Sequence, residues 1–289
     1  MTAQETPRVT AIVPAYKSAR FIGETLDSLA AQTWDNLEIL VGDDASPDDT
    51  AEVVRTFAER HPNARVVLRP RNMGWIANTN DLMAQATGEF LFYMPHDDLL
   101  EPTYVERLAG ALADRPQAII AYSDLLFGEV GRPATVHSFD RLSGIESGVT
   151  RASQMLRMPY GWWVPHRGVF RARAFRAIGG LRPAPFIGQF SADFPWLVQM
   201  AALGGFVRVP EVLYHKRWMP ESLSRNWTGG HDPKRALLMS AALGIRGLPI
   251  GRGDKAAILA GLAGYAAARE AKRLPITLRR VLGRKTARS

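Results

Sequence analysis

The chain has 289 residues, of which 46% are hydrophobic and 22% charged, and it has no cysteine. These values are typical of a globular chain of about two domains, or of one large domain with an appendage, so they exclude a largely disordered or fibrous protein, disulfide bonds and thiolate metal sites. The net charge is +8, but residues 1–216 hold 21 basic and 24 acidic residues, whereas residues 217–289 hold 15 basic and 4 acidic ones.

Short apolar runs alternate with amphipathic stretches through the first 127 residues. In chain order they predict a strand at 9–14, a helix at 21–32, a strand at 37–41, a helix at 46–60 capped by Ser46, a strand at 65–68, a helix at 76–86, a strand at 89–94, a helix at 101–115 and a strand at 118–123. This alternation predicts an α/β fold with a mainly parallel, doubly wound sheet that is flanked by helices.

The alternation stops after residue 127. Residues 128–190 are rich in glycine, proline and aromatic residues and predict only short helical pieces. Further elements follow at 193–203 (helix), 206–216 (strand), 233–244 (helix) and 255–273 (helix), and a basic stretch ends the chain. The longest near-continuous apolar run, residues 256–268, is shorter than the about 20 residues that cross a membrane. The N-terminus lacks the pattern of a secretory signal, so we expect a cytoplasmic protein.

Polar side chains follow four of the predicted strands. Two acidic pairs, Asp43-Asp44 and Asp97-Asp98, come directly after the second and fourth strands. Ligands of open α/β sheets bind at the carboxyl ends of the strands, where these pairs would meet. One such pair is typical of a turn or a helix cap. Two pairs on adjacent strands indicate a hard divalent cation that carries diphosphate oxygens, because neighbouring carboxylates repel each other without compensation.

Five segments together resemble the GT-A glycosyltransferases of family 2. They are IVPAY at 12–16, VGDDAS at 41–46, RNMG at 71–74, FYMPHDD at 92–98 and SADFPWLVQM at 191–200. The likeness covers residues 8 to about 225. It implies a Rossmann-like GT-A domain in which residues 1–127 bind the nucleotide sugar and residues 128–230 bind the acceptor and carry catalysis. Residues 231–289 form a helical, basic C-terminal extension. The G-x-G-x-x-G fingerprint of dehydrogenases is absent.

The resemblance assigns the nucleotide pocket to residues after the first three strands. These residues are Pro14, Ala15, Tyr16, Asp44, Asn72 and Gly74. Tyr16 would lie near the base, Asp44 would hydrogen-bond it, and Asn72 and Gly74 would form the wall beside base and ribose.

The resemblance also implies a divalent cation, Mn²⁺ or Mg²⁺, at Asp97 and Asp98, with Asp98 as the favoured ligand. A third acid, frequent two residues before Asp97, is replaced here by Pro95. His96 is either a solvent-facing loop residue or a contact to phosphate or sugar. Farther on, His215 and Arg217 lie where a basic or histidine residue approaches the metal or diphosphate, although both also fit a cationic surface strand.

Asp193 matches the position of the general base in the family, where it takes a proton from the acceptor hydroxyl. Without the resemblance, a helix N-cap is the simpler interpretation of Asp193. Trp162, Trp163 and His166 lie in the segment that usually contacts the acceptor. We expect one of the two tryptophans to belong to the core and the other to the acceptor site.

The resemblance therefore predicts an inverting, metal-dependent hexosyltransferase in polysaccharide or cell-envelope synthesis. A nucleotide-diphosphate sugar, by default a UDP-sugar, would donate to a hydroxyl of a glycan, glycolipid or lipid-linked acceptor. One alternative is a sugar-phosphate nucleotidyltransferase, although its Gly-rich basic loop is missing. Another is an adaptor that binds nucleic acid or membrane through its basic end. The acidic strand ends argue against nucleic acid as a partner.

Basic and apolar residues alternate in the last 21 residues, which hold eight Lys or Arg and one Glu. This pattern favours peripheral binding to an anionic membrane, at the inner face of the cell membrane. The alternatives are a solvated tail, or C-terminal helices that pack on the catalytic domain or on a second copy in a homo-oligomer.

Overall fold

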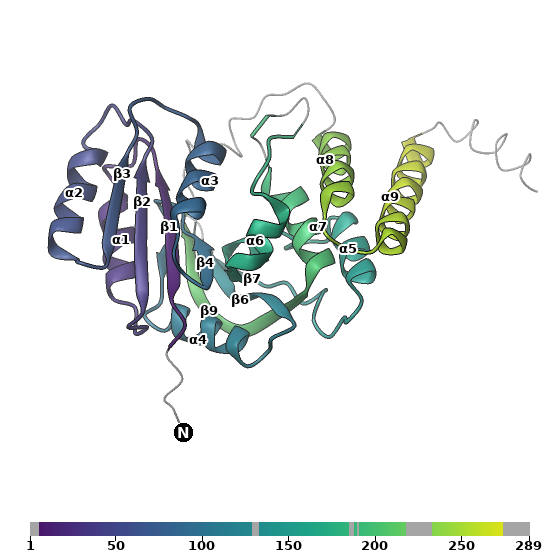
Figure 1. Cartoon of the computed structure of the whole chain (residues 1–289), viewed down its shortest axis with the longest axis horizontal. Coiled ribbons are helices and arrows are strands. Elements are labelled where there is room, and N and C mark those ends of the chain that lie inside the picture. Colours follow the sequence, from purple (N-terminus) through teal and green to yellow (C-terminus); the bar gives the residue numbers. More distant parts are fainter. Residues whose placement is uncertain (1–5, 129–132, 185–187, 190, 218–232, 274–289) are drawn as a thin grey trace, which may run out of the picture.

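The computed structural model describes residues 6–128, 133–184, 188–189, 191–217 and 233–273 (Figure 1). Among these residues, the strands form one sheet in the order β3-β2-β1-β4-β8-β6-β9-β5, and β7 pairs with the second half of β6. The strands are β1 (Val9–Ala15), β2 (Leu37–Asp43), β3 (Ala64–Leu68), β4 (Phe90–Tyr93), β5 (Leu99–Leu100), β6 (Ala118–Gly128), β7 (Thr135–His137), β8 (Val169–Arg171) and β9 (Gly205–Arg217). The helices are α1 (Ile22–Ala30), α2 (Thr50–Arg60), α3 (Trp75–Gln85), α4 (Tyr104–Ala113), α5 (Gly148–Leu156), the short 3-10 helix η1 (Val164–Arg167), α6 (Ala172–Ile178), α7 (Asp193–Leu203), α8 (Pro233–Gly247) and α9 (Arg252–Arg273).

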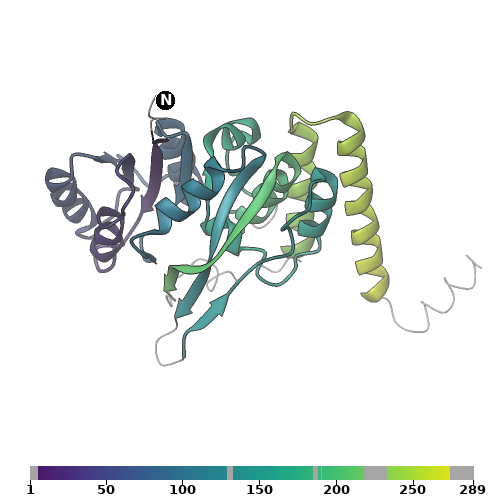
Figure 2. The same ribbon diagram turned by 90° about the horizontal axis from the view of Figure 1, so that it is seen from below.

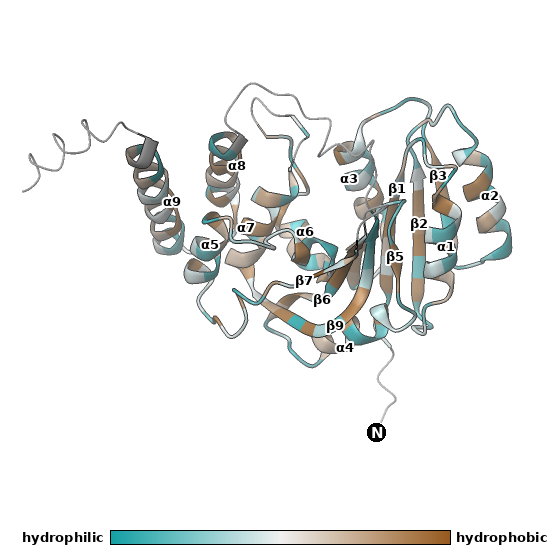
Figure 3. Ribbon diagram, turned by 180° about the vertical axis from the view of Figure 1, so that it is seen from behind, coloured by the Kyte–Doolittle hydropathy of each residue, from teal (hydrophilic) through white to brown (hydrophobic). Residues whose placement is uncertain are grey.

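The first half of the sheet has the predicted parallel arrangement. β3, β2, β1 and β4 all run in the same direction, and every residue of β1 and β2 is buried. Continuous burial is what strands covered by helices on both faces require, and their aliphatic sequences supply it. In Figure 3 the apolar colour follows these central strands. The parallel order brings the ends of β1, β2 and β4 to one edge of the sheet.

The second half of the sheet continues through antiparallel pairings. β8 lies antiparallel between β4 and β6, and β9 runs parallel to β6. The two-residue strand β5 closes the edge, where Leu99 pairs with His215 and Leu100 with Tyr214. The chain between β4 and β5 is therefore held against the end of β9. This link positions Asp97 and Asp98.

Helices form the end of the molecule opposite β3. α7 packs against α5 and α8, and α9 packs outermost against α5 and α8 (Figures 1 and 2). α5 begins at Ser147, whose hydroxyl accepts a hydrogen bond from the N–H of Thr150 and so caps the helix. Within the residues that the structure describes, no helix is long and apolar enough to cross a membrane.

The expected α/β fold class is confirmed, and two local predictions need correction. The helix predicted from residue 46 begins at Thr50, because Asp48 accepts a hydrogen bond from the N–H of Thr50. The hydroxyl of Ser46 accepts instead from the N–H of Lys17 in the neighbouring loop. The region predicted to hold only short helical pieces contains the short helices α5, η1 and α6, and it also contains two strands, β7 and β8. Short antiparallel strands of this kind depend on distant partners and leave little periodic signal.

Candidate active site

The residues assigned to the nucleotide lie at the carboxyl-end edge of the sheet. Pro14 and Ala15 end β1 within the buried core, while Tyr16 follows with its ring 38% exposed. The ammonium group of Lys17 lies 5.4 Å from the centre of the Tyr16 ring. Tyr16 therefore presents an accessible aromatic surface beside the end of the sheet.

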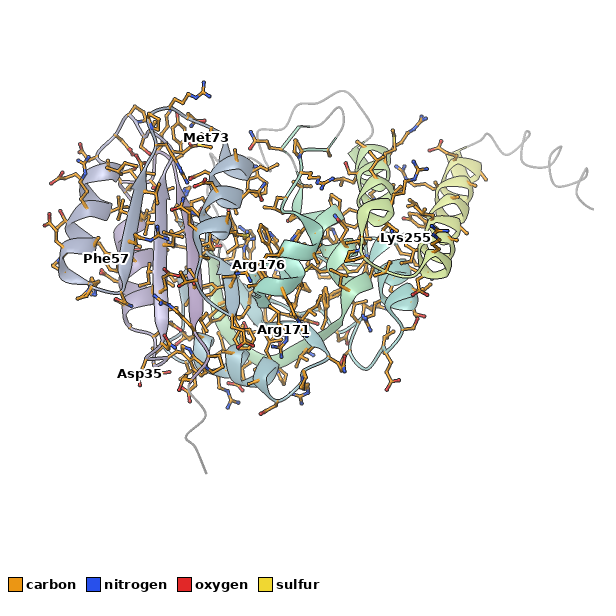
Figure 4. The ribbon with its side chains drawn as sticks, in the orientation of Figure 1. Asp35, Phe57, Met73, Arg171, Arg176 and Lys255 are labelled. Atoms are coloured by element: carbon orange, nitrogen blue, oxygen red, sulfur yellow. The ribbon has the colours of Figure 1, made fainter. Side chains whose placement is uncertain are left out.

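Asp44 ties the end of β2 to the loop before α3. Its two carboxylate oxygens accept hydrogen bonds from the N–H groups of Met73 (2.7 Å) and Gly74 (2.9 Å). The side chain of Asn72 also accepts from the N–H of Gly74, at 3.0 Å. Figure 4 labels Met73 at this edge. Gly74 has a φ of 84°, which favours glycine. The structure thus brings Asp44, Asn72 and Gly74 together at one edge of the sheet.

Asp98 is fully buried, and donors occupy both of its carboxylate oxygens. Oδ2 accepts a hydrogen bond from the hydroxyl of Tyr214 at 2.7 Å, and Oδ1 accepts one from the main-chain N–H of Arg217 at 2.9 Å. The Nε atom of Arg167 lies 3.5 Å from Oδ2. Asp98 thus links the turn after β4 to β9 and η1.

The carboxylate of Asp97, unlike that of Asp98, is partly accessible to solvent. It is half-buried, and no hydrogen-bond donor of the described residues contacts its side-chain oxygens. Burial raises its pKa, and repulsion from Asp98 raises it further, whereas His96, Lys216 and Arg167 oppose these effects. A divalent cation would relieve that repulsion, so Asp97 fits a metal-binding role. The described residues contain no cluster of three or more His, Asp or Glu side chains, so a cation would need further oxygens from its ligand.

Arg167 is the central residue that sequence reasoning missed. Its guanidinium lies over the ring of Tyr93, 5.6 Å from the ring centre, and its charge acts on both Asp98 and Asp193. The hydroxyl of Tyr104 donates to its carbonyl oxygen at 2.5 Å and holds the end of η1 in place. The only sequence signal was a charged residue inside the apolar stretch VPHRGVF.

His166, which the sequence placed in the acceptor segment, is buried beside Arg167. Its Nδ1 atom lies 2.8 Å from Nη1 of Arg167, and its ring packs against Tyr93 and Trp196. Burial and the neighbouring guanidinium hold the pKa of His166 well below its usual value. His96 lies next to the end of β1, where its Nδ1 atom is 3.3 Å from the carbonyl oxygen of Pro14.

Asp193 is the first residue of α7, and Ala192 occupies the N-cap position without a side-chain cap. Burial raises the pKa of Asp193, while the charge of Arg167 and the adjacent backbone N–H groups lower it. A carboxylate with a raised pKa is a stronger base, and the charge of Arg167 limits how far burial raises this pKa. Asp193 is thus not the N-cap of α7, and its position is compatible with proton abstraction.

The predictions for the two residues of β9, His215 and Arg217, have different outcomes. Arg217 is brought to the acidic pair: its main chain contacts Asp98, and its side chain contacts Glu24 and the carbonyl oxygen of Asp97. His215 pairs instead with Glu101 at 2.6 Å and lines a surface recess between α1, β5 and β9. The structure does not bring His215 to the carboxylates of Asp97 and Asp98.

Trp162 and Trp163 are both half-buried and have different neighbours. Trp162 packs edge-on against Phe194, which follows Asp193, with ring centres 5.0 Å apart. Trp163 lies 5.4 Å from the ring of His137 in β7. Trp162 therefore contacts the residue next to Asp193, and Trp163 directly precedes η1, which carries Arg167.

Comparisons with known proteins identify the family and the fold. A model of the family described as "Glycosyl transferase family 2" matches residues 10–175, which include both acidic pairs and Arg167 but not Asp193. The glycosyltransferase YibD of Escherichia coli (strain K12) is 31% identical over 154 residues, covering 53% of this chain and 44% of YibD. The chain spans less than half the length of the first curated relatives that it matches.

Two groups of solved structures share the fold. TarS 1–349 of S. aureus, in complex with UDP-GlcNAc, has a TM-score of 0.68 and 19% identity, with 89% of this chain and 71% of that chain covered. The mannosyltransferase PcManGT from Pyrobaculum calidifontis, in complex with GDP-Man and Mn²⁺, has a TM-score of 0.53 and 23% identity, with 97% and 80% covered. At these identities the likeness shows that the fold is shared.

Proposed function

The chain belongs to glycosyl transferase family 2, and from that premise we propose that it transfers a sugar from a nucleotide-diphosphate sugar to a hydroxyl group of a glycan, glycolipid or lipid-linked acceptor, with inversion. One observation carries the proposal. The guanidinium of Arg167, which is only 16% exposed, lies 3.5 Å from Asp98 in the acidic pair after β4, and its charge also acts on Asp193 at the start of α7. In this proposal residues 1–127 bind the donor, and residues 128–230 bind the acceptor.

The donor is proposed to occupy the edge formed by β1, β2 and the loop before α3. The exposed ring of Tyr16 would cover the base, and the backbone held by Asp44 would form the wall beside it. The presence of UDP-GlcNAc on TarS supports a UDP-sugar as the first donor to test, and the GDP-Man on PcManGT supports GDP-mannose as the second.

A divalent cation, Mn²⁺ or Mg²⁺, is proposed to bind at Asp97 together with the diphosphate of the donor. The Mn²⁺ in PcManGT supports this assignment. When bound, the cation would neutralise the charge that grows on the departing diphosphate. Asp98, the favoured ligand from sequence, already accepts hydrogen bonds from Tyr214 and from the N–H of Arg217 and is ion-paired with Arg167. Its proposed role is therefore to fix the turn that carries Asp97.

Asp193 is proposed to be the general base. The acceptor oxygen attacks the anomeric carbon, the bond from that carbon to the phosphate oxygen breaks, and its electron pair leaves with the nucleoside diphosphate. The hydroxyl proton passes to the carboxylate of Asp193. Since the burial of Asp193 raises its pKa, this carboxylate accepts a proton more readily than an exposed aspartate does.

The basic C-terminal stretch supports a further part of the proposal, a peripheral contact with an anionic membrane surface. Residues 274–289 lie outside the described residues, and α9, which leads into them, is the outermost helix (Figure 2). A membrane-bound position would suit an enzyme with a lipid-linked acceptor.

A thermal-shift screen over nucleotide sugars, with and without Mn²⁺, tests the donor assignment. We expect UDP-sugars or GDP-mannose to raise the melting temperature of the whole chain, and EDTA to reduce the shift. No shift with any nucleotide sugar in the presence of Mn²⁺ would contradict the proposed function.

A further inference from the structure

A solvent-facing group of aromatic rings lies where the β6–β7 hairpin meets the turn before η1. We call Phe127, His137, Tyr160 and Trp163 the aromatic platform. The ring of His137 is stacked on Tyr160 (centres 5.8 Å apart, planes at 29°), is tilted against Trp163 (5.4 Å) and meets Phe127 edge-on (5.7 Å). Three separate segments thus contribute to one aromatic surface around His137.

The platform is exposed and yet fixed in place. Tyr160 is 79% exposed, more than any other large hydrophobic residue that the structure describes. Its hydroxyl is hydrogen-bonded to Nδ1 of His137 (3.0 Å), and Nε2 of His137 lies 3.0 Å from the hydroxyl of Thr135. Burial lowers the pKa of His137, which favours the neutral ring that this arrangement needs. Core packing does not explain an aromatic ring that is 79% exposed and hydrogen-bonded to His137.

Two short connections join the platform to the proposed catalytic residues. Lys216 of β9 lies over the ring of Phe127, 5.6 Å from its centre, and its charge also acts on Asp97. Trp163 directly precedes η1, whose last residue is Arg167. Figure 2 shows the β6–β7 hairpin and the end of β9 projecting together from one side of the body.

The platform also lies on the side of the sheet away from the proposed nucleotide edge. The donor residues follow β1, β2 and β3, whereas the platform belongs to β6, β7 and the segment before η1. β4 and β8 separate the two groups in the sheet order. A ligand on the platform would therefore approach the acidic pair from the side opposite to the nucleotide.

We propose that the aromatic platform is an acceptor subsite that binds a pyranose ring of a glycan, with the C–H face of the sugar stacked on Tyr160. This inference rests on the proposed function. The C–H bonds of a pyranose face carry partial positive charge and complement the negative face of an aromatic ring. A tyrosine offers a large, rigid contact area at a small entropic cost. The hydroxyls of Thr135 and Tyr160 and the ammonium of Lys216 stand at the rim to pair with sugar hydroxyls.

The size of the platform favours a sugar over a protein partner. One highly exposed ring with three neighbours is far smaller than the about 800 Å² per partner that a stable protein interface buries. Its polar rim suits a ligand with many hydroxyls. A membrane surface would call for a cluster of several basic residues, whereas Lys216 is the basic residue that the described part of the chain places over a platform ring.

The test compares glycan binding by the full chain and three variants on a printed array of several hundred oligosaccharides. Tyr160→Ala removes the ring, Tyr160→Phe keeps it, and Leu243→Ala removes a 54% exposed side chain on α8 as the matched control. We expect Tyr160→Ala to bind the glycans of the wild type at least about 10-fold more weakly, Tyr160→Phe within about 3-fold, and Leu243→Ala equally well. Melting temperatures check that each variant is folded.

Two results would overturn the subsite. They are equal glycan binding by the wild type and a folded Tyr160→Ala variant, and no binding of any glycan by the wild type. Release of nucleoside diphosphate from nucleotide sugars by the wild type is measured in parallel. Its absence would refute the proposed enzyme activity, whereas the array reports on the platform by itself, so the two failures are distinguishable.

Discussion

The Nε atom of Arg167 lies 3.5 Å from Oδ2 of Asp98, and the same guanidinium acts electrostatically on Asp193. The charge of Arg167 thus acts on two carboxylates, Asp98 after β4 and Asp193 at the start of α7. The positive charge partly compensates the acidic pair and opposes the rise that burial causes in the pKa of Asp193, the proposed base. Arg167 therefore has a positioning and electrostatic role that the sequence motifs did not reveal.

Substituting Arg167 by Gln should lower stability and shift the pH–rate profile. Removing one partner of a buried ion pair leaves Asp98 uncompensated, and we expect a loss on the order of 3 kcal/mol. Because Arg167 lowers the pKa of Asp193, the substitution raises that pKa, so the rising limb of the profile moves to higher pH. Denaturant melts and initial rates between pH 5 and 9 measure both effects.

Arg208→Gln is the matched control, since Arg208 pairs with Asp124 through two 2.7 Å hydrogen bonds and contacts none of the site carboxylates. Its profile should keep the wild-type midpoint. An unchanged midpoint in the Arg167→Gln variant as well would show that Arg167 does not tune the base.

The two residues of the second acidic pair should respond differently to Asn substitution. Asp98→Asn weakens three buried contacts and is expected to destabilise the protein by about 1–3 kcal/mol. Asp97→Asn should not lower stability at neutral pH and should instead abolish stimulation by Mn²⁺. Thermal melts and Mn²⁺ titrations of activity separate these outcomes. Full Mn²⁺ stimulation in Asp97→Asn would refute the assignment of Asp97 as the cation ligand.

Asp97 also makes a prediction about pH and stability. Burial and Asp98 raise its pKa in the folded state, so the folded protein binds more protons than the unfolded chain above the usual aspartate pKa. The contribution of Asp97 to stability therefore falls as pH rises from the unfolded pKa through the raised folded pKa. Asp97→Asn should remove this decline, so its stability relative to wild type should increase from pH 4 to pH 7 in urea melts. A constant difference across this range would contradict the raised pKa.

The ends of the strands and the chemistry at them were largely predictable from sequence. Buried aliphatic runs followed by Asp43-Asp44 and Asp97-Asp98 need only local periodicity and the rule that parallel strands end at one edge. The helix that begins at Asp193 was predicted with its observed bounds. These features depend on neighbours within about ten residues along the chain.

The roles within the site depended on contacts that no local pattern records. Asp98 meets Tyr214 and Arg217 across more than 100 residues of sequence, and β5 pairs with β9 over a similar separation. These pairings decide that Asp98 is buried and Asp97 accessible, a distinction invisible in the dipeptide. They also turn His215 toward Glu101, because successive side chains of a strand point to opposite faces.

The basic C-terminal stretch should mediate binding to anionic vesicles. Full-length protein is expected to float with phosphatidylserine-containing liposomes at low salt and to dissociate at high salt, because each basic residue near such a surface contributes about 1 kcal/mol. A chain that ends at Lys272 should stay in the soluble fraction. Equal flotation of the two proteins would assign membrane binding elsewhere, and no flotation of the full chain at low salt would remove it.

The most direct test of the central claim is chromatographic measurement of nucleoside diphosphate release from UDP-sugars and GDP-mannose, with Mn²⁺ and an acceptor glycan selected on the array. We predict release and a new glycoside with the wild type, a rate at least about 100-fold lower with Asp193→Asn, and an unchanged rate with Asp254→Asn, which alters the acidic residue in the first turn of α9. Failure of the wild type to release nucleoside diphosphate from any donor, or equal rates for wild type and Asp193→Asn, would contradict the account.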